Sequence, residues 1–279
     1  LHCLASASST NPYVPDGTLS GAVFTVVNAM DMHSKSQEVQ EWGIRALYSQ
    51  CMLSTHAESN KKNLAQSGMD GGGGMGVIQQ AMETARTDLV TVELACRLYW
   101  SLAANEDVAR RLMESPGAFN AIVDALERNH KKPEASPMME AAFGALANLA
   151  RVCENQQLFR DSSVIPKATQ SINAYHYDEK LYIEACGLLG VLATDPRNFE
   201  ILTSLDVVNV ISKLMNHYAH NQVLQEEAMW SLVCLTNGSE SGKLALSAEA
   251  TIGSVVRIMR DSKASLSMQE MACTLIGSL

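Results

Sequence analysis

An apolar pattern recurs along this chain at intervals of 43 to 52 residues, which is the range of periods that defines repeat architectures. Aligning six segments on one small residue gives Gly43, Ala95, Ala142, Ala185, Ala228 and Ala272. Four residues later stand Leu47, Tyr99, Leu146, Leu189, Leu232 and Ile276; seven residues later stand Gln50, Leu102, Leu149, Leu192, Leu235 and Leu279. These three columns share one face of an α-helix, and only Gln50 is polar. Each repeat therefore contains a long helix with one apolar face.

Shorter helices are predicted before each long one. Apolar segments typical of a second helix are Ala118–Leu126, Val164–Ile172, Val207–Met215 and Ile252–Met259; amphipathic segments before two of the second helices are Val108–Met113 and Asn198–Leu205. Two repeats are longer because each carries a loop insertion: the glycine-rich segment 67–76, and the segment 129–137 with two prolines and two lysines. One repeat of three helices buries too little apolar surface to fold alone, so neighbouring repeats must share a core.

This pattern resembles an armadillo-repeat (ARM) array. Second helices open with Gly117-Ala118-Phe119 and with Val164-Ile165-Pro166-Lys167-Ala168, and the most similar third helices are Ala141–Leu149 and Leu224–Leu232. The resemblance implies an all-α fold, a right-handed α-solenoid (superhelix) of three-helix repeats. The predicted organisation is an irregular segment 1–18, a partial first repeat 19–53, a repeat 54–104 with the insertion 67–76, further repeats 105–153, 154–195 and 196–237, and a truncated repeat 238–279. Because Leu279 falls on an apolar column and residue 1 is not Met, we expect a fragment of a longer protein.

Composition excludes several classes of function. The net charge is −9, from 30 acidic and 21 basic residues, which argues against binding to nucleic acid. The longest apolar or small run, 185–193, is too short for a membrane helix, and residues 1–20 lack the layout of a secretory signal. Seven cysteines, an odd number, argue for a reducing compartment, so we expect an intracellular protein of the cytoplasm, the nucleus or both.

Weak chemical motifs are better explained by structure. Gly71–Gly76 fits the dinucleotide-binding glycine pattern, but no strand is predicted before it, so we interpret it as part of an insertion. His217 and His220 share a helix face without further ligands at metal-binding spacing. One column, which holds Cys96, Cys186 and Cys273 beside Ile44, Phe143 and Met229, indicates a packing position for small apolar side chains. We therefore expect no catalytic site, no metal and no cofactor.

Every third helix begins with a carboxylate close to its first turn. The acids are Glu41, Glu93, Glu140, Glu184, Glu226, Glu227 and Glu270. One interpretation is structural, because acids at a helix N-terminus are stabilised by the helix dipole. The other is functional, because a row of carboxylates on stacked helices would form an acidic wall. Arg45 and Arg97 stand four residues after Glu41 and Glu93 and can neutralise them, whereas the later helices have no cation at that position.

The functional interpretation predicts a groove over residues 140 to 235. Armadillo arrays bind extended partners along a concave face lined by third helices, and the resemblance implies the same here. Glu140, Glu184, Glu226 and Glu227 are expected to bind Lys or Arg of a basic segment, Trp230 to pack on an alkyl stem or cation, and Asn148 to bind the partner's backbone. Importin-α-like receptors place Trp and Asn in the same third helix, which this sequence never does, so a nuclear-localisation-signal site is not expected.

The primary prediction is a non-catalytic scaffold that binds a protein or peptide partner in this groove. Two alternatives stay open: a regulatory array attached to a catalytic domain in a longer parent chain, or a nuclear-transport or small-GTPase regulator. The sequence leaves the oligomeric state open.

Overall fold

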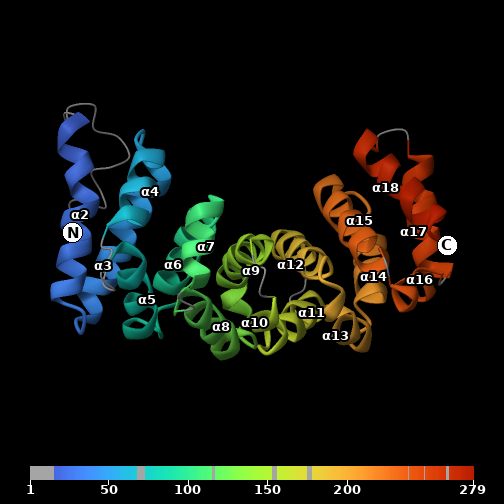
Figure 1. The fold of residues 1–279 in the computed structure, drawn as a ribbon, viewed down its shortest axis with the longest axis horizontal. Helices are drawn as coiled ribbons and strands as arrows, with labels where there is room; N and C mark the ends of the chain where they lie inside the picture. Colours follow the sequence, from blue (N-terminus) through green and yellow to red (C-terminus); the bar gives the residue numbers. More distant parts are fainter. Residues whose placement is uncertain are drawn as a thin grey trace. The chain divides into compact units, whose positions relative to one another are not determined.

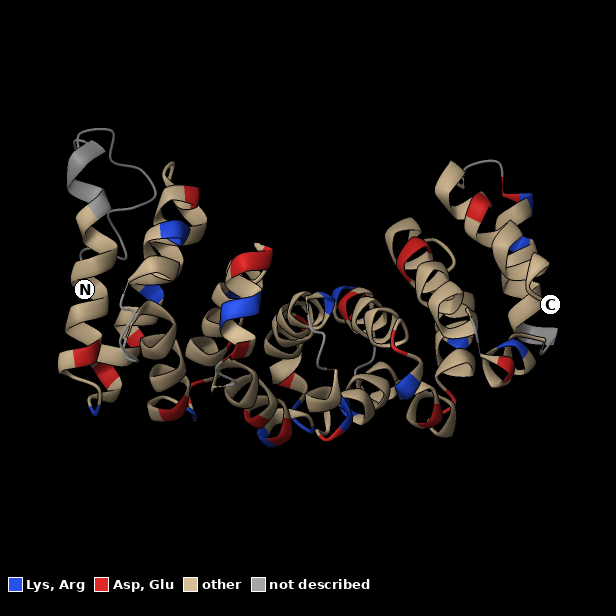
Figure 2. Ribbon diagram, viewed as in Figure 1, with Lys and Arg blue, Asp and Glu red and all other residues tan. Residues whose placement is uncertain are grey.

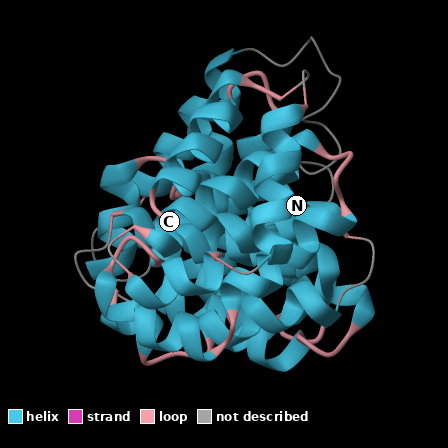
Figure 3. Cartoon of the chain, turned by 90° about the vertical axis from the view of Figure 1, so that its right-hand side faces the viewer, coloured by secondary structure: helices cyan, strands magenta, loops and turns pink. Residues whose placement is uncertain are grey.

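The computed structural model describes residues 16–67, 73–114, 117–152, 156–174, 178–237, 239–247, 249–261 and 264–279. Within these ranges every regular element is a helix (Figure 3). The chain divides into two compact units, Leu1–Arg128 (unit 1) and Asn129–Leu279 (unit 2). None of the described helices is long and apolar enough to cross a membrane.

The helices of unit 1 follow one another as the repeat predicts (Figure 1). They are α2 (Asp16–Met32), α3 (Gln37–Tyr48), a π-helical stretch η1 (Ser49–Leu53), α4 (Ala57–Gln66), α5 (Gly74–Thr84), α6 (Leu89–Leu102), α7 (Glu106–Glu114) and α8 (Gly117–Asn129). The long third helices are α3 and α6, and they pack against each other. The second helices α2 and α5 pack against α3, so the unit has two layers with the core between them.

Unit 2 repeats this arrangement. Its helices are η2 (Pro133–Ala135), α9 (Ser136–Arg151), α10 (Gln157–Arg160), α11 (Val164–Ala174), α12 (Glu179–Leu192), η3 (Pro196–Asn198), α13 (Phe199–Ser204), α14 (Val207–His217), α15 (Gln222–Thr236), α16 (Glu240–Leu246), α17 (Glu249–Arg260) and α18 (Leu266–Gly277). The third helices form one row, in which α12 packs against α9 and α15, and α15 packs against α18. The second helices form the other row, in which α14 packs against α11 and α17. The predicted three-helix repeat is confirmed.

The small-residue column lies in the core, as predicted. Gly43 and the five aligned alanines are all buried, and at Gly43 the close neighbour is Met30 of the second helix α2. Gln50, the polar exception, is 1% exposed, and Asn60 Nδ2 donates a hydrogen bond to its carbonyl oxygen over 2.8 Å. The prediction is wrong for Ile276 and Leu279, which are 36% and 53% exposed, because no described helix covers that side of α18.

Three glutamines, of which Gln40 and Gln225 are buried and Gln269 is half-buried, strengthen the link between second and third helices. Gln40, Gln225 and Gln269 each stand three residues before the small residue of their repeat. The Gln225 amide donates to the carbonyl oxygens of Met215 and Tyr218, over 2.9 and 3.1 Å, at the end of α14. Gln40 and Gln269 donate in the same way to the ends of α2 and α17. These bonds satisfy carbonyl groups that a helix C-terminus leaves without an intrahelical partner.

Several predicted boundaries shift in the structure. Helix α2 starts at Asp16, inside the segment 1–18 that was expected to be irregular, and residues 1–15 lie outside the described residues. Helix α5 starts at Gly74, so the last glycines of the predicted insertion 67–76 form its first turn. Helix α9 starts at Ser136, inside the predicted insertion 129–137, because a short 3-10 turn leads into it and proline is tolerated in the first turn of a helix.

Candidate functional site

The first turn of each third helix is fixed by its N-cap. In five third helices the N-cap residue stands seven positions before the small residue of the repeat. Its side chain accepts a hydrogen bond from a backbone N–H of the first turn. These N-cap residues are Ser36, Asp88, Asp178, Asn221 and Ser265. The corresponding residue of α9 is Ala135, which makes no such bond, and this helix follows the 3-10 turn instead. The sequence analysis missed this column, although a polar capping residue at constant spacing was visible in the sequence.

In unit 2, the N-cap of one third helix is also bonded to the first helical residue of its neighbour. Ser136 of α9 donates its hydroxyl proton to Asp178, and Asn221 donates from its amide to Glu179 at the start of α12. These bonds hold the first turns of α9, α12 and α15 in register. Residues one or two positions before the small residue therefore lie close together on adjacent helices.

This register gathers three carboxylates, one from each helix: Glu140 of α9, Glu184 of α12 and Glu227 of α15. All three are half-buried. Burial, together with the negative charges of Glu227 and Glu140, raises the pKa of Glu184 to about 7 against the opposing effect of Arg151. Burial also raises the pKa of Glu227, which Arg151 opposes. The pKa of Glu184 thus depends on acids of both neighbouring helices, and we call these three residues the acidic cluster (Glu140, Glu184 and Glu227).

Two glycines of α12 make room for side chains of α15. A Cβ atom at Gly187 would lie 2.7 Å from Glu227 Oε1, so the absence of a side chain at Gly187 leaves room for the end of the Glu227 side chain against α12. A Cβ atom at Gly190 would lie 2.5 Å from the ring of Trp230. Ser231 of α15 donates a hydrogen bond of 2.7 Å to the backbone carbonyl of Cys186 between these two contacts. Glu227 and Trp230, which stand just before and just after Ala228 on α15, are thereby positioned against α12.

The other predicted site residues belong to the same part of unit 2. Glu226 is half-buried next to Glu227, and its charge contributes to the raised pKa of Glu227. Trp230 is half-buried. Asn148 is half-buried on α9, where its Oδ1 accepts a hydrogen bond of 2.9 Å from Arg151 Nη1.

The expected pairing of charges needs two corrections. Arg97 does pair with Glu93, with 2.8 Å between Nε and Oε1, but Arg45 does not pair with Glu41. Its guanidinium reaches across to Asp88, the cap of α6, with 3.3 Å between Nη2 and Oδ2. The later acids are also not left without a cation, because Arg151, three residues beyond Asn148, lowers the pKa of both Glu184 and Glu227.

The packing interpretation of the cysteine column is confirmed for two members. Cys96 and Cys186 are fully buried, and burial raises the pKa of the Cys96 thiol to about 12. Cys273 is exposed, so the interpretation is wrong there. The glycine pattern 71–76 follows helix α4, and its last three residues open α5; Gly71 and Gly72 lie outside the described residues.

His217 and His220 both lie near Tyr218. The ring centroids of His217 and Tyr218 are 4.8 Å apart, and His220 Nε2 lies 3.3 Å from Glu179 Oε1. Among the residues that the structure describes, no three His, Cys, Asp or Glu side chains are arranged to hold a metal ion.

Comparisons with known proteins place this geometry in a family. A protein-family profile described as "GAC ARM domain" matches residues 91–278. The chain belongs to the GAC ARM domain family. No curated protein matches the GAC ARM domain described here.

Solved structures similar to this GAC ARM domain include two engineered proteins of the Northeast Structural Genomics Consortium. The first has a TM-score of 0.72 at 18% identity and covers 92% of this chain and 95% of its own; the second has a TM-score of 0.65 at 16% identity and covers 95% and 98%. The designed armadillo repeat protein YIII(Dq)4CqI has a TM-score of 0.65 at 16% identity and covers 91% and 98%. The fold of the GAC ARM domain is therefore the armadillo-type α-solenoid. Armadillo-repeat domains are in general protein-interaction scaffolds, and this fold is typically non-catalytic.

Proposed function

We propose that this chain is a non-catalytic scaffold, and that unit 2 binds a basic, extended segment of a protein partner across the third helices α9, α12 and α15. The binding residues are Glu140, Glu184, Glu226, Glu227, Trp230 and Asn148. The observation that carries the proposal is the acidic cluster itself, in which carboxylates of both neighbouring helices, Glu140 and Glu227, raise the pKa of Glu184.

A cationic side chain of a partner would stabilise the charged forms of the carboxylates in this cluster, which burial and neighbouring negative charges disfavour. Glu184 and Glu227 are half-buried, so each loses hydration, and Arg151 is the cation whose effect on both opposes this cost. A guanidinium or ammonium group of a partner would add attraction to three carboxylates without bringing a new negative charge. The glycine contacts support this role, because they hold Glu227 and Trp230 in place before any partner arrives and so reduce the ordering cost of binding.

Trp230 and Asn148 extend the surface on either side. The Trp230 ring contacts α12 at Gly190 but is only half-buried, which leaves part of it accessible to an alkyl stem or a cation of the partner. Asn148 is half-buried on α9, and an amide of this kind can both donate to and accept from a peptide backbone. An extended segment that crosses α9, α12 and α15 would meet these groups in turn.

The test is binding of a fluorescently labelled decapeptide with four arginines, measured by fluorescence anisotropy at low salt. The double variant Glu184→Gln/Glu227→Gln removes two charges with almost no change of shape, and we expect it to bind at least about ten-fold more weakly. Arg151→Ala should bind more tightly than the wild type, because the acids lose their internal cation.

The matched control is Glu134→Gln/Glu200→Gln, which removes the same charge from exposed positions of unit 2. It should bind within about two-fold of the wild type, as is usual for charges outside a binding site. Equal affinity of the wild type and the cluster variant would refute the proposal. Equal weakening by both double variants would show attraction to the net charge of the chain instead of a site.

A further inference from the structure

Unit 1 contains a cavity of about 700 Å³ lined by residues of α4, the end of α6, the turn after it and α7. Its volume is in the range of ordinary ligand-binding pockets. The apolar part of its lining comes from Ala65 of α4, Leu102 of α6, Val108 of α7 and Ala104 in the turn between the last two helices. This cavity lies between first helices and is separate from the third-helix surface of unit 2.

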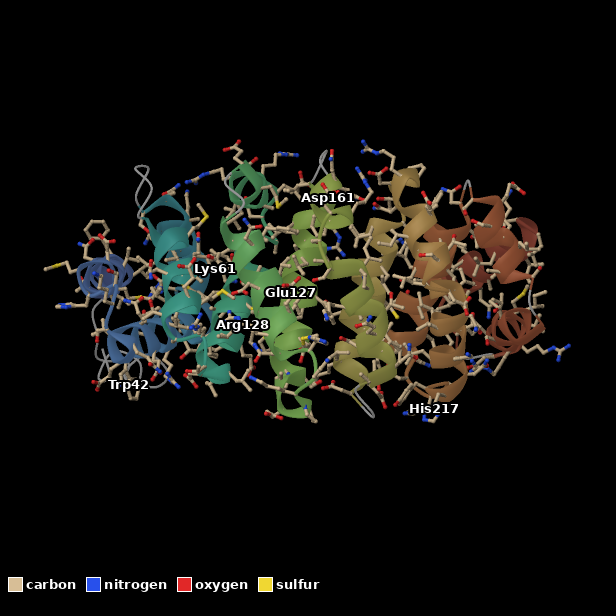
Figure 4. All side chains as sticks on the ribbon, turned by 90° about the horizontal axis from the view of Figure 1, so that it is seen from below. Trp42, Lys61, Glu127, Arg128, Asp161 and His217 are labelled. Atoms are coloured by element: carbon tan, nitrogen blue, oxygen red, sulfur yellow. The ribbon has the colours of Figure 1, made fainter. Side chains whose placement is uncertain are left out.

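Cationic side chains line this cavity from both sides. Lys61 and Lys62 belong to α4 and Arg111 belongs to α7. Figure 2 shows Lys and Arg segments on both helices, and Lys61 is labelled in Figure 4. In a chain with a net charge of −9, such a concentration of cations stands apart from the average composition.

The two acids that line the cavity each have a cationic partner. Glu58 Oε1 lies 2.7 Å from Nζ of Lys61, which also lines the cavity, and Asp107 Oδ1 lies 3.4 Å from Nη1 of Arg110, which also pairs with Glu106 over 3.1 Å and does not line the cavity. Lys62 and Arg111 form no hydrogen bond or ion pair with the part of the chain that the structure describes. The cavity therefore offers two uncompensated cations, one on each side of an apolar floor.

We infer that this cavity binds an acidic peptide segment of a protein partner, with Lys62 and Arg111 binding carboxylates and the floor taking an apolar side chain. Arginine suits this task because its guanidinium binds a carboxylate through two parallel hydrogen bonds. A peptide fits better than a nucleic acid, because a phosphate backbone is bound by many cations and is repelled by the net negative charge of the chain. The apolar floor also matches amino-acid side chains.

Binding of a labelled decapeptide with four glutamates and two leucines tests this inference, again by fluorescence anisotropy on the full chain. Lys62→Glu and Arg111→Glu should each weaken binding by about ten-fold, because each change replaces attraction by repulsion at a short distance. Ala104→Trp, at an exposed position of the lining, should weaken binding by filling the cavity while leaving every charge in place.

The matched control is Lys35→Glu, the same charge change at an exposed position of unit 1 outside the cavity, which should bind like the wild type. Circular dichroism and thermal melting verify the fold of each variant. If a charge-reversal variant fails to fold, the neutral variant Lys62→Gln or Arg111→Gln is used in its place. Unchanged affinity in the folded cavity variants overturns the inference. So does a single-stranded decanucleotide that binds as tightly as the peptide, or equal weakening by Lys35→Glu. The result is independent of the acidic cluster, whose variants leave this cavity intact.

Discussion

Glu184 is held half-buried on α12 next to two other carboxylates, and its protonation is therefore coupled to folding. Its pKa is about 7 in the folded chain, against an ordinary value of 4.5, because burial and two neighbouring acids disfavour its charge. Between these values the folded state binds more protons than the unfolded state. Glu184 therefore contributes stability that is present below about pH 4.5 and is lost as the pH rises through 7.

We predict that Glu184→Gln raises the free energy of unfolding at pH 8 by about 1–2 kcal/mol, a value reduced because the side chain is partly exposed. At pH 4.5 the change should be small, because the wild-type carboxyl is then protonated and resembles the amide. Urea denaturation at the two pH values measures the difference. Glu200→Gln, at an exposed site of unit 2, should show no such pH dependence. An equal effect of Glu184→Gln at both pH values would show that charge is not the cause.

The sequence predicted which acids lie near one another but not which cations reach them. The column of acids could be predicted because the position of each acid on its helix depends only on residue spacing within that helix. The ion pair from Arg45 to Asp88 joins two helices, and the effect of Arg151 on Glu184 and Glu227 likewise crosses from one helix to the next. Distances between helices depend on how their side chains pack. The spacing of residues along one helix does not determine these distances.

The α12 helix shows how an element is adapted to its neighbour. Gly187 and Gly190 lie on the side of α12 that contacts α15, where they accept Glu227 and Trp230. Glycine in a helix interior costs roughly 1 kcal/mol relative to alanine. From the sequence, the position that Gly187 occupies was recognised only as one without a cation in the later third helices. Its contact with Glu227 could not be predicted, because it depends on the distance between α12 and α15.

Alanine substitution should separate the two glycines. Gly187→Ala is expected to leave stability unchanged or raise it by up to about 1 kcal/mol, because the atom in its way ends a flexible side chain. Gly190→Ala is expected to lower stability by about 1–3 kcal/mol, because it forces a rigid indole ring and Ser231 to move. Thermal and urea unfolding of both variants measure the contrast. If the two variants are destabilised equally, the Trp230 contact is not the tighter constraint.

At the scale of the whole molecule, the chain consists of two compact units, and stability in a repeat array is transmitted from each repeat to its neighbours. The repeat itself could be predicted, because small residues recur at nearly constant spacing and lie in the core. The division into two units between Arg128 and Asn129 could not be predicted. The segment that follows it was expected to be a loop insertion, but this insertion is shorter in the structure and is followed by a 3-10 turn.

We predict that Leu189→Ala, which truncates a fully buried side chain of α12, costs about 2–5 kcal/mol and acts locally. Hydrogen exchange followed by mass spectrometry should show lower protection in α9, α12 and α15 than in the wild type. Protection in α3 and α6 of unit 1 should change much less. Uniform loss of protection in both units would instead indicate one cooperative unit of folding.

The paired glycines of α12 also limit how this molecule can be rearranged. In an array of identical units, any two neighbours could be exchanged without loss. Here Gly190 leaves room for the Trp230 ring of α15. Helix α18 has Thr274 at the position of Trp230, so placing α18 next to α12 in place of α15 would leave the space at Gly190 unfilled. The order of the repeats is thus encoded in their contact faces as well as in the continuity of the chain.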